Sequence, residues 1–582
     1  MLIVNAVAMQ TRHVGDYIYR VEQPSIAMGK TGKATVVTVN TVSPWFETLC
    51  QSADLLILHL LSEHDLLPII EERRRNGRPT LYELSDNILS LHGGIGIRGW
   101  FSDPVNLALA FQYMRLAHAV QVTGPGLAEQ FAFVNPQVIV FENQIAKLDE
   151  YKRKTGQRVI LGWAGSSGHK RDIEEILDVI ADVIREFSHV DFALMGDRAI
   201  YEQFIAVLPP ERVFYTPPGT LEEYLAFLQR LDIGIAPLQD NPYNQCRSDV
   251  KFLEYASRGV VSVLRSLGPY SVSAEHGKTG FLYNTPQQLS EILSQLVSDM
   301  PLRERISRNA YEYVENFRNE DLHADRRLDF YAGFIPANHC NSSISQGIPL
   351  VRYYEGSEYY EAATCEAESL LLDGIRLASS GKDDIAIETF FRSADALPWY
   401  SLPWFWLGYH ALRRGDPQAP RWFDEAIKRN PRSLRSYWLK AKSLKDRNPS
   451  SAFSGLAELL KRWTSYAPAA FSMGEILEAN GAYDESQHWY NDALRINPFF
   501  SSAALGLGRI YEISGETEKA GLAYGTAADL APCWAEAQYA MSLWYFSRRD
   551  HGKAVEYCSR ALMIDKNHAG AQDLSRKILS GQ

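Results

Sequence analysis

The sequence predicts two consecutive α/β domains followed by an all-α solenoid of repeats. Three observations support this fold class. Short β-branched runs alternate with amphipathic helical stretches over about the first 330 residues, as in parallel βαβ units. Nine of the twelve Trp lie at or beyond Trp399, so the composition changes two thirds along the chain. The last third repeats its pattern of small and large residues every 34 residues. A length of 582 residues suits about three or four domains.

Composition and charge exclude several classes of protein. Hydrophobic residues make up 46% and charged residues 22%, which is typical of a folded globular chain. The net charge of -11 argues against binding to nucleic acid or to an anionic lipid surface. None of the six cysteines forms a CxxC pair, so we expect neither a zinc site nor a disulfide framework. No apolar run is long enough to span a membrane, and we expect a cytoplasmic protein.

The first domain is predicted to span residues 1–156 and the second residues 157–332. Residues 1–7 are interpreted as a first buried strand, and residues 53–58 with 64–74 as a strand and its helix. In the second domain, strands are expected at 159–164, 233–238 and 260–264. We expect helices in 302–332 to cross back and brace the first domain.

Residues 333–365 lack a helical period and are rich in Pro, Gly, Asn and Ser, so they predict a linker long enough to permit hinging. Its aromatic residues Tyr353, Tyr354, Tyr359 and Tyr360 suggest that part of it packs down. In 366–582, Pro498 and Pro532 stand 34 residues apart, and Gly508, Tyr511 and Gly515 keep fixed places in the repeat. This pattern resembles the tetratricopeptide repeat and implies five clear hairpins and one degenerate one around 438–468. Such a solenoid is expected to hold a peptide, a protein or a second copy of the chain.

A Gly/Ser turn follows the strand at 159–164. A glycine-rich turn that opens a helix lets backbone N–H groups approach a phosphate, and the helix N-terminus favours the anion. The alternative is an ordinary structural turn. The candidate residues for phosphate binding in this turn are Gly165, Ser166, Ser167, His169 and Lys170.

A second candidate cluster follows the strand at 233–238. If a helix begins near Ser248, then Arg247, Ser248, Lys251 and Glu254 lie near one face of its N-terminal end. The cations suit a diphosphate and the carboxylate suits ribose hydroxyls. The alternative is a surface Lys–Glu pair.

The stretch 244–259, continued through 268–270 and 276–282, resembles the nucleotide-sugar domain of group 1 (family 4-like) glycosyltransferases. The resemblance covers about residues 1–330 and is strongest over 157–298. It implies the GT-B architecture, two facing Rossmann-like domains, with a nucleotide-diphosphate sugar as donor substrate and no cofactor. It also implies metal-independent transfer with retention. Residues 165–170 and 247–251 would meet the diphosphate, and Glu254 would be the second acid of the family's E-x7-E motif.

Two departures from the family pattern stand out. Cys246 occupies the place of the first acid in that motif, eight residues before Glu254. Ser166 stands where the family usually has an arginine, so Arg247 or Lys251 would have to supply that charge.

Candidates for the catalytic group come from the first domain. Glu83 and Asp86 follow the strand expected at 79–82, and His59 ends the strand before it. For each of them a structural role is the alternative.

The sequence therefore predicts a nucleotide-sugar-dependent glycosyltransferase whose acceptor is a protein recruited by the repeats. One alternative is a surface-polysaccharide transferase whose repeats dock a partner or dimerise. Another is a non-catalytic scaffold with a degenerate transferase domain, suggested by Cys246 and Ser166.

Overall fold

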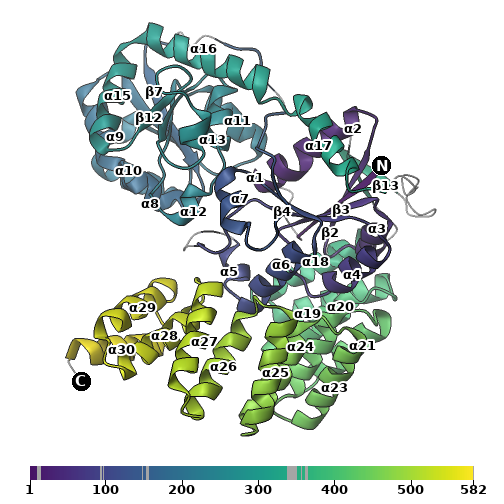
Figure 1. The fold of residues 1–582 in the computed structure, drawn as a ribbon. Helices are drawn as coiled ribbons and strands as arrows, with labels where there is room; N and C mark the ends of the chain where they lie inside the picture. The colour runs from purple at the N-terminus through teal and green to yellow at the C-terminus, as the bar shows by residue number, and fades with distance from the viewer. Residues whose placement is uncertain are drawn as a thin grey trace.

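The computed structural model describes residues 1–8, 15–91, 95, 97–146, 148–152, 156–336, 350–354, 357–360 and 365–580. It confirms the predicted fold class. Two parallel α/β domains lie one above the other in Figure 1, and a helical solenoid runs along the far side of the first. No helix among these residues has both the length and the hydropathy of a membrane span.

The N-terminal sheet is parallel and buried on both faces, which explains its continuous Val, Ile and Leu runs. Its strand order is β2-β1-β3-β4-β5-β6. The strands are β1 (Leu2–Val7), β2 (Thr35–Asn40), β3 (Leu55–His59), β4 (Thr80–Leu84), β5 (Ala119–Val122) and β6 (Val138–Val140). The helices are α1 (Gly15–Tyr17), the π-helix Ile18–Glu22, α2 (Gln23–Lys30), α3 (Phe46–Ser52), α4 (Leu66–Arg75), α5 (Arg98–Phe101), α6 (Pro104–Leu116) and α7 (Pro125–Phe131).

The second sheet has the order β12-β11-β10-β7-β8-β9 and is also parallel. Its strands are β7 (Val159–Gly165), β8 (Val190–Gly196), β9 (Val213–Thr216), β10 (Ile233–Ala236), β11 (Val261–Arg265) and β12 (Phe281–Tyr283). Its helices are α8 (Lys170–Glu174), α9 (Leu177–Glu186), α10 (Arg198–Val207), α11 (Leu221–Gln229), α12 (Pro242–Gln245), α13 (Val250–Ala256), α14 (Tyr270–Ser273) and α15 (Pro286–Ser298). The helix expected near Ser248 begins instead at Val250, after a turn at Asp249.

Two helices follow the second domain, and the later one returns to the first. Helix α16 (Met300–Phe317) packs on α13 and β11, within the second domain. Helix α17 (Ala324–Ala332) packs on α2, where Leu328 and Tyr331 join the same apolar cluster as Ile3. The bracing expected from residues 302–332 is therefore carried by α17.

The segment predicted as a linker contains a β-hairpin. Strand β13 (Leu350–Tyr354) pairs antiparallel with β14 (Ser357–Tyr360), and β14 adds to the edge of the N-terminal sheet beside β2. Backbone hydrogen bonds thus hold this part of the segment against the first domain, as expected for the part of the linker that packs down.

The solenoid has six helical hairpins and a final helix among the described residues. The hairpins are α18–α19 (Cys365–Ser379, Asp383–Ala396), α20–α21 (Leu402–Arg413, Ala419–Arg429), α22–α23 (Leu434–Leu444, Pro449–Arg462), α24–α25 (Ala467–Ala479, Tyr483–Ile496), α26–α27 (Ser501–Ile513, Thr517–Leu530) and α28–α29 (Ala535–Ser547, His551–Ile564). Helix α30 (Ala569–Ser580) ends the array. The stretch where the sequence pattern degenerates still folds as a hairpin, α22–α23.

One edge of the solenoid is fixed to the N-terminal domain. Five residues that precede successive first helices of the hairpins, spaced 33 or 34 apart, contact that domain: Tyr400, Ser433, Tyr466, Phe499 and Cys533, here called the docking edge. One apolar cluster runs without a break from β1 through α6 into α26. The repeats therefore share one apolar core with the N-terminal domain, and the tethered, hinging solenoid expected from the sequence is not what the structure contains.

Candidate functional site

Each sheet has one point where the strand order reverses, and the two predicted sets of site residues lie there. In the N-terminal sheet the reversal falls between β1 and β3, and in the second sheet between β7 and β10. Open parallel sheets bind ligands beyond the carboxyl ends of the strands at such a point. The predicted donor residues follow β7 and β10, and the predicted catalytic residues lie at the carboxyl ends of β3 and β4.

The turn after β7 is tightly constrained at its first residue. A Cβ at Gly165 would lie 2.5 Å from the Trp163 ring, so glycine is required there for packing. Ser166 is exposed, and Lys170 is the first residue of α8, with its Nζ 3.8 Å from a Glu174 carboxylate oxygen. A structural reason for Gly165 thus exists beside the predicted phosphate-binding role.

A chain of hydrogen bonds links this turn to the N-terminal domain. His169 Nδ1 lies 2.9 Å from Asp172 Oδ2, and Arg247 donates from Nη2 to His169 Nε2 at 2.8 Å. Arg247 also donates to Tyr243 Oη at 2.9 Å, and Tyr243 donates to Asp86 Oδ1 at 3.0 Å. Burial, together with the charge of Arg247, lowers the pKa of His169, so its ring is neutral and Nε2 accepts. The structure thus brings His169, Arg247 and Asp86 together across the two domains.

Lys251 and Glu254 form the i,i+3 ion pair that the alternative interpretation expected, but the pair is not on the surface. Lys251 Nζ lies 3.1 Å from Glu254 Oε2 and donates to Tyr224 Oη at 2.6 Å. Glu254 is buried, and it accepts hydrogen bonds from Tyr224 at 2.5 Å and from Tyr19 of the N-terminal domain at 2.8 Å. This carboxylate therefore also bridges the two domains. Ser248 is half-buried in the turn before α13.

Cys246, at the place of the missing family acid, is packed into the domain interface. Its thiol accepts a hydrogen bond from Asn87 Nδ2 at 3.6 Å, and the backbone beside it abuts Gly126 in α7. Burial raises the pKa of the Cys246 thiol. An uncharged side chain at this position suits a buried contact better than a carboxylate would.

For two of the predicted catalytic residues, Glu83 and His59, the surrounding side chains limit proton transfer. Glu83 lies inside β4, not after it, and is buried with its carboxylate 2.8 and 3.2 Å from Arg20 nitrogens. The structure gives Glu83 the environment of a structural ion pair. His59 ends β3 with Nε2 2.9 Å from Asn5 Oδ1, and burial, with Arg20 and Arg327 nearby, lowers its pKa to about 3. A ring with that pKa is a weak base at neutral pH.

Asp16 is a functional candidate that the sequence reasoning missed. It lies in α1, beyond the carboxyl end of β1, and accepts a hydrogen bond from Ser85. The surrounding protein, with Asp86 close by, raises the pKa of Asp16 to about 7. A carboxyl group that titrates near neutral pH suits acid–base chemistry. Its position after the first predicted strand was the available signal.

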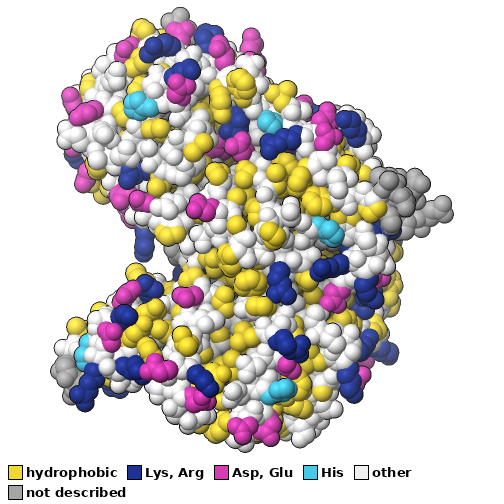
Figure 2. Space-filling model, in the orientation of Figure 1, with side chains coloured by type: hydrophobic (Ala, Val, Ile, Leu, Met, Phe, Trp, Pro, Cys, Tyr) yellow, Lys and Arg dark blue, Asp and Glu magenta, His cyan; other side chains and the backbone are white. Residues whose placement is uncertain are grey.

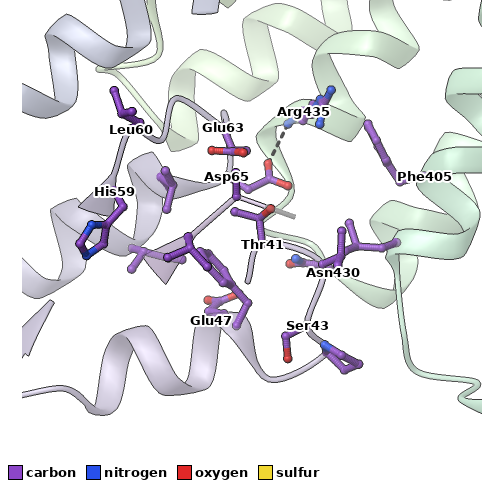
Figure 3. A pocket seen from close by; sticks show the side chains of 18 of the residues that line it. Thr41, Ser43, Glu47, His59, Leu60, Glu63, Asp65, Phe405, Asn430 and Arg435 are labelled. Atoms are coloured by element: carbon purple, nitrogen blue, oxygen red, sulfur yellow. Dashed lines mark hydrogen bonds between the residues drawn. The ribbon is translucent and has the colours of Figure 1, made fainter. Parts of the chain in front are cut away.

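A cavity of about 960 Å³ opens beside Asp16, between the N-terminal sheet and the second and third repeats. Figure 3 shows residues of the sheet domain on one side and Phe405, Asn430 and Arg435 of the repeats on the other. Leu60, just after β3, has a φ of 50°, and this left-handed turn leads the chain toward Glu63 and Asp65. The strand-end residues that line the cavity are Val7, Thr41, Ser43, His59, Leu60 and Ser85.

Comparisons with known proteins gave matches to the repeats and to the first part of the chain. The tetratricopeptide repeat model matches residues 467–500, which contain the α24–α25 hairpin. No curated protein is similar enough in sequence to match the chain.

Three solved structures are similar to the first part of the chain. HepE from Anabaena, in complex with UDP-glucose, is 15% identical and covers 57% of this chain and 100% of its own, with a TM-score of 0.45. Sucrose-phosphate synthase from Thermosynechococcus elongatus is 14% identical and covers 57% and 98%, with a TM-score of 0.44. TarM from S. aureus is 13% identical and covers 49% and 58%, with a TM-score of 0.39. Because these identities and TM-scores are low, our assignment of the fold depends on the strand order described above.

Proposed function

We propose that the protein is a glycosyltransferase that moves a sugar from a nucleotide-diphosphate donor to a protein acceptor recruited with the help of the repeats. The main observation in support is that the carboxyl ends of strands in the two sheets face each other across the domain interface. His169 and Arg247, after β7 and β10, face Asp86 and its neighbour Asp16, after β4 and β1. Cations on one side suit a leaving diphosphate, and a carboxyl group on the other suits an attacking hydroxyl.

Residues of both domains would take part in transfer. Arg247, with Lys170 and Lys251, would stabilise the negative charge of the departing diphosphate. We propose that transfer needs no metal ion and retains the anomeric configuration, as the family resemblance implies. In its ionised form Asp16 would hydrogen-bond and orient the acceptor hydroxyl. We further propose a cytoplasmic location.

A direct test measures nucleotide release by the full-length protein. UDP-glucose is the first donor to try, because it is the ligand named for HepE, and GDP-mannose and ADP-glucose serve as comparisons. Release of the diphosphate from one of the three, at a rate above that of heat-denatured protein, supports the proposal. Absence of both binding and release for all three would contradict it.

A second candidate function is a binding scaffold without transfer. Cys246 favours it, because the thiol is buried against Asn87 where the family places an acid for the donor sugar. Saturable donor binding with no nucleotide release, even with acceptor present, would select this candidate over the transferase.

A further inference from the structure

We propose that the cavity between the N-terminal sheet and the second and third repeats binds a short, extended segment of a polypeptide acceptor that carries a basic side chain next to an apolar one. This inference rests on the proposed transferase function and deepens it. It names the class of acceptor and the place where the acceptor binds.

Residues of the N-terminal domain and of the repeats together line the cavity. One wall consists of the carboxyl ends of β1 to β4, which is where a parallel sheet presents its ligand site. The other wall comes from the residues before and within α20 and from those leading into α22. Since the docking edge fixes these repeats to the domain, an acceptor in the cavity would contact both. Its volume of about 960 Å³ lies within the range of specific ligand sites.

The repeat wall offers aromatic surface. Trp399 is 48% exposed and packs against Trp45 at a ring-centroid distance of 5.4 Å, and Phe405 and Trp406 continue the wall. An exposed Trp beside a cavity is apolar area that a ligand can cover. Aromatic-lined grooves are a recurring way to bind extended peptides. This wall would take the apolar side chain of the segment.

The sheet wall offers carboxylates. Glu63 and Asp65 both line the cavity, and neither has a cation within ion-pair distance among the residues that the structure describes. Asp65 accepts hydrogen bonds from the Arg435 backbone at 2.9 Å and from Ser433 at 2.9 Å, whereas Glu63 accepts one at 3.1 Å from the backbone of Ser62. Figure 3 shows both side chains in the cavity close-up, with the Asp65–Arg435 bond as a dashed line. Glu63 thus keeps acceptor capacity for an incoming cation.

These carboxylates decide between the possible classes of acceptor. Burial raises the pKa of both Glu63 and Asp65, although the charge of Arg435 opposes the rise, so their charged forms are only partly compensated in the cavity. A Lys or Arg side chain would supply the remaining compensation. An uncharged oligosaccharide would leave these carboxylates only partly compensated. A polyanion would be repelled by them, because Arg429 and Arg432, which also line the cavity, are already ion-paired with other carboxylates. The far end of the cavity reaches Asp16 and Ser85, so a hydroxyl in the same segment would lie beside the transfer site.

The test uses full-length protein without donor and a library of blocked heptapeptides that have a serine at the centre and varied flanking positions. Affinity is read from tryptophan fluorescence and calorimetry. We expect peptides with both a basic and an apolar residue to bind best. Replacement of Lys by norleucine should weaken binding about 10-fold or more, the range of charge-assisted hydrogen bonds.

Matched variants assign that effect to the cavity. In Glu63→Gln the Lys and norleucine peptides should bind with nearly equal affinity, whereas Glu458→Gln, on an exposed face of α23, should keep the difference. Trp399→Ala should weaken both peptides. A library with no binder above the level of the Glu63→Gln/Trp399→Ala double variant would overturn the inference. Binding of maltohexaose that depends on Trp399 would also overturn it, in favour of a glycan acceptor.

A measurement of nucleotide release in the same samples separates this inference from the proposed function. Donor-dependent release with no peptide binding would refute the peptide site and leave the transferase standing. Peptide binding without interaction with any nucleotide sugar would support the site and contradict the transferase.

Discussion

At the residue scale, Asp16 is the side chain best suited to meet an acceptor hydroxyl. Its pKa is raised from its usual value to about 7, so ionisation, and with it the ability to accept a proton or a hydrogen bond, increases as the pH rises through 7. We predict that kcat rises with pH below about 7 and levels off above it. Asp16→Asn should remove that rise and lower kcat by about 100-fold or more.

The control for this prediction is Asp182→Asn, which changes an exposed carboxylate in α9. Its pH–rate profile should match that of the unchanged protein. A profile of Asp16→Asn that still rises through pH 7 would assign the titration to another group.

A second prediction at this scale concerns the Lys251–Glu254 pair. Lys251→Ala should weaken donor binding by about 1.5–3 kcal/mol, the range for charge-assisted hydrogen bonds. It should also lower the free energy of unfolding, because Glu254 is buried and Lys251 is its ion-pair partner. Adding Glu254→Gln should restore part of the stability. Calorimetry with UDP-glucose and urea unfolding measure the two effects, and unchanged donor affinity in Lys251→Ala would defeat the donor assignment.

Strand ends could be predicted from the sequence, but their partners across the domain interface could not. Hydrophobic runs placed His59, Glu83 and Gly165 near strand ends, and the family resemblance selected Arg247. The hydrogen bond from Tyr243 to Asp86 depends on how two separately folded sheets face each other. No spacing within one domain contains that information. Asp16 was missed for a different reason: its raised pKa comes from burial by the surrounding protein and from Asp86 of the same domain, and the ends of β1 and β4 come together only in the folded sheet.

At the scale of elements, glycines set the spacing of the helices within the repeat hairpins. A Cβ at Gly474, in α24, would lie 2.6 Å from the Tyr490 ring of α25, so the two helices touch only because no side chain is present. Gly474→Ala should lower the free energy of unfolding by about 1–3 kcal/mol through this overlap.

Gly455→Ala is the matched control for Gly474→Ala. Gly455 lies inside α23 with no atom near the position of a Cβ, so alanine there should stabilise the protein by about 0.5–1 kcal/mol. Urea unfolding of the two variants checks the sign of each change. Equal changes in the two would show that helix propensity, and not packing against Tyr490, controls these sites.

The repeat period predicted the hairpins, but it could not show that the docking-edge residues contact the N-terminal domain. Tyr400, Ser433 and Tyr466 recur with nearly the same period as the repeat itself, so in the sequence they are indistinguishable from ordinary positions between hairpins. Their partners are Val42, Asp65 and His64 of the N-terminal domain. The hydroxyl groups find these partners only after both parts have folded.

At the scale of the whole molecule, the fused apolar core makes the repeats necessary for a stable first domain. Figure 2 shows hydrophobic side chains along the junction, and the same apolar cluster includes Leu67, Phe111 and Tyr466. A protein cut after residue 336 would expose the apolar surface of α4 and α6 to water, at a cost of roughly 25 cal/mol per Å². We predict that it self-associates, binds a hydrophobic dye and unfolds at a lower urea concentration than the full chain. A shorter cut after residue 567, which removes α30, is the control and should stay monomeric, because the apolar contacts of α30 within the described part of the chain are with α28 and α29. Analytical ultracentrifugation and urea unfolding compare the three proteins. A monodisperse protein of residues 1–336 with the urea midpoint of the full chain would mean that the repeats are an independent attachment, and the acceptor cavity would then lack a fixed second wall.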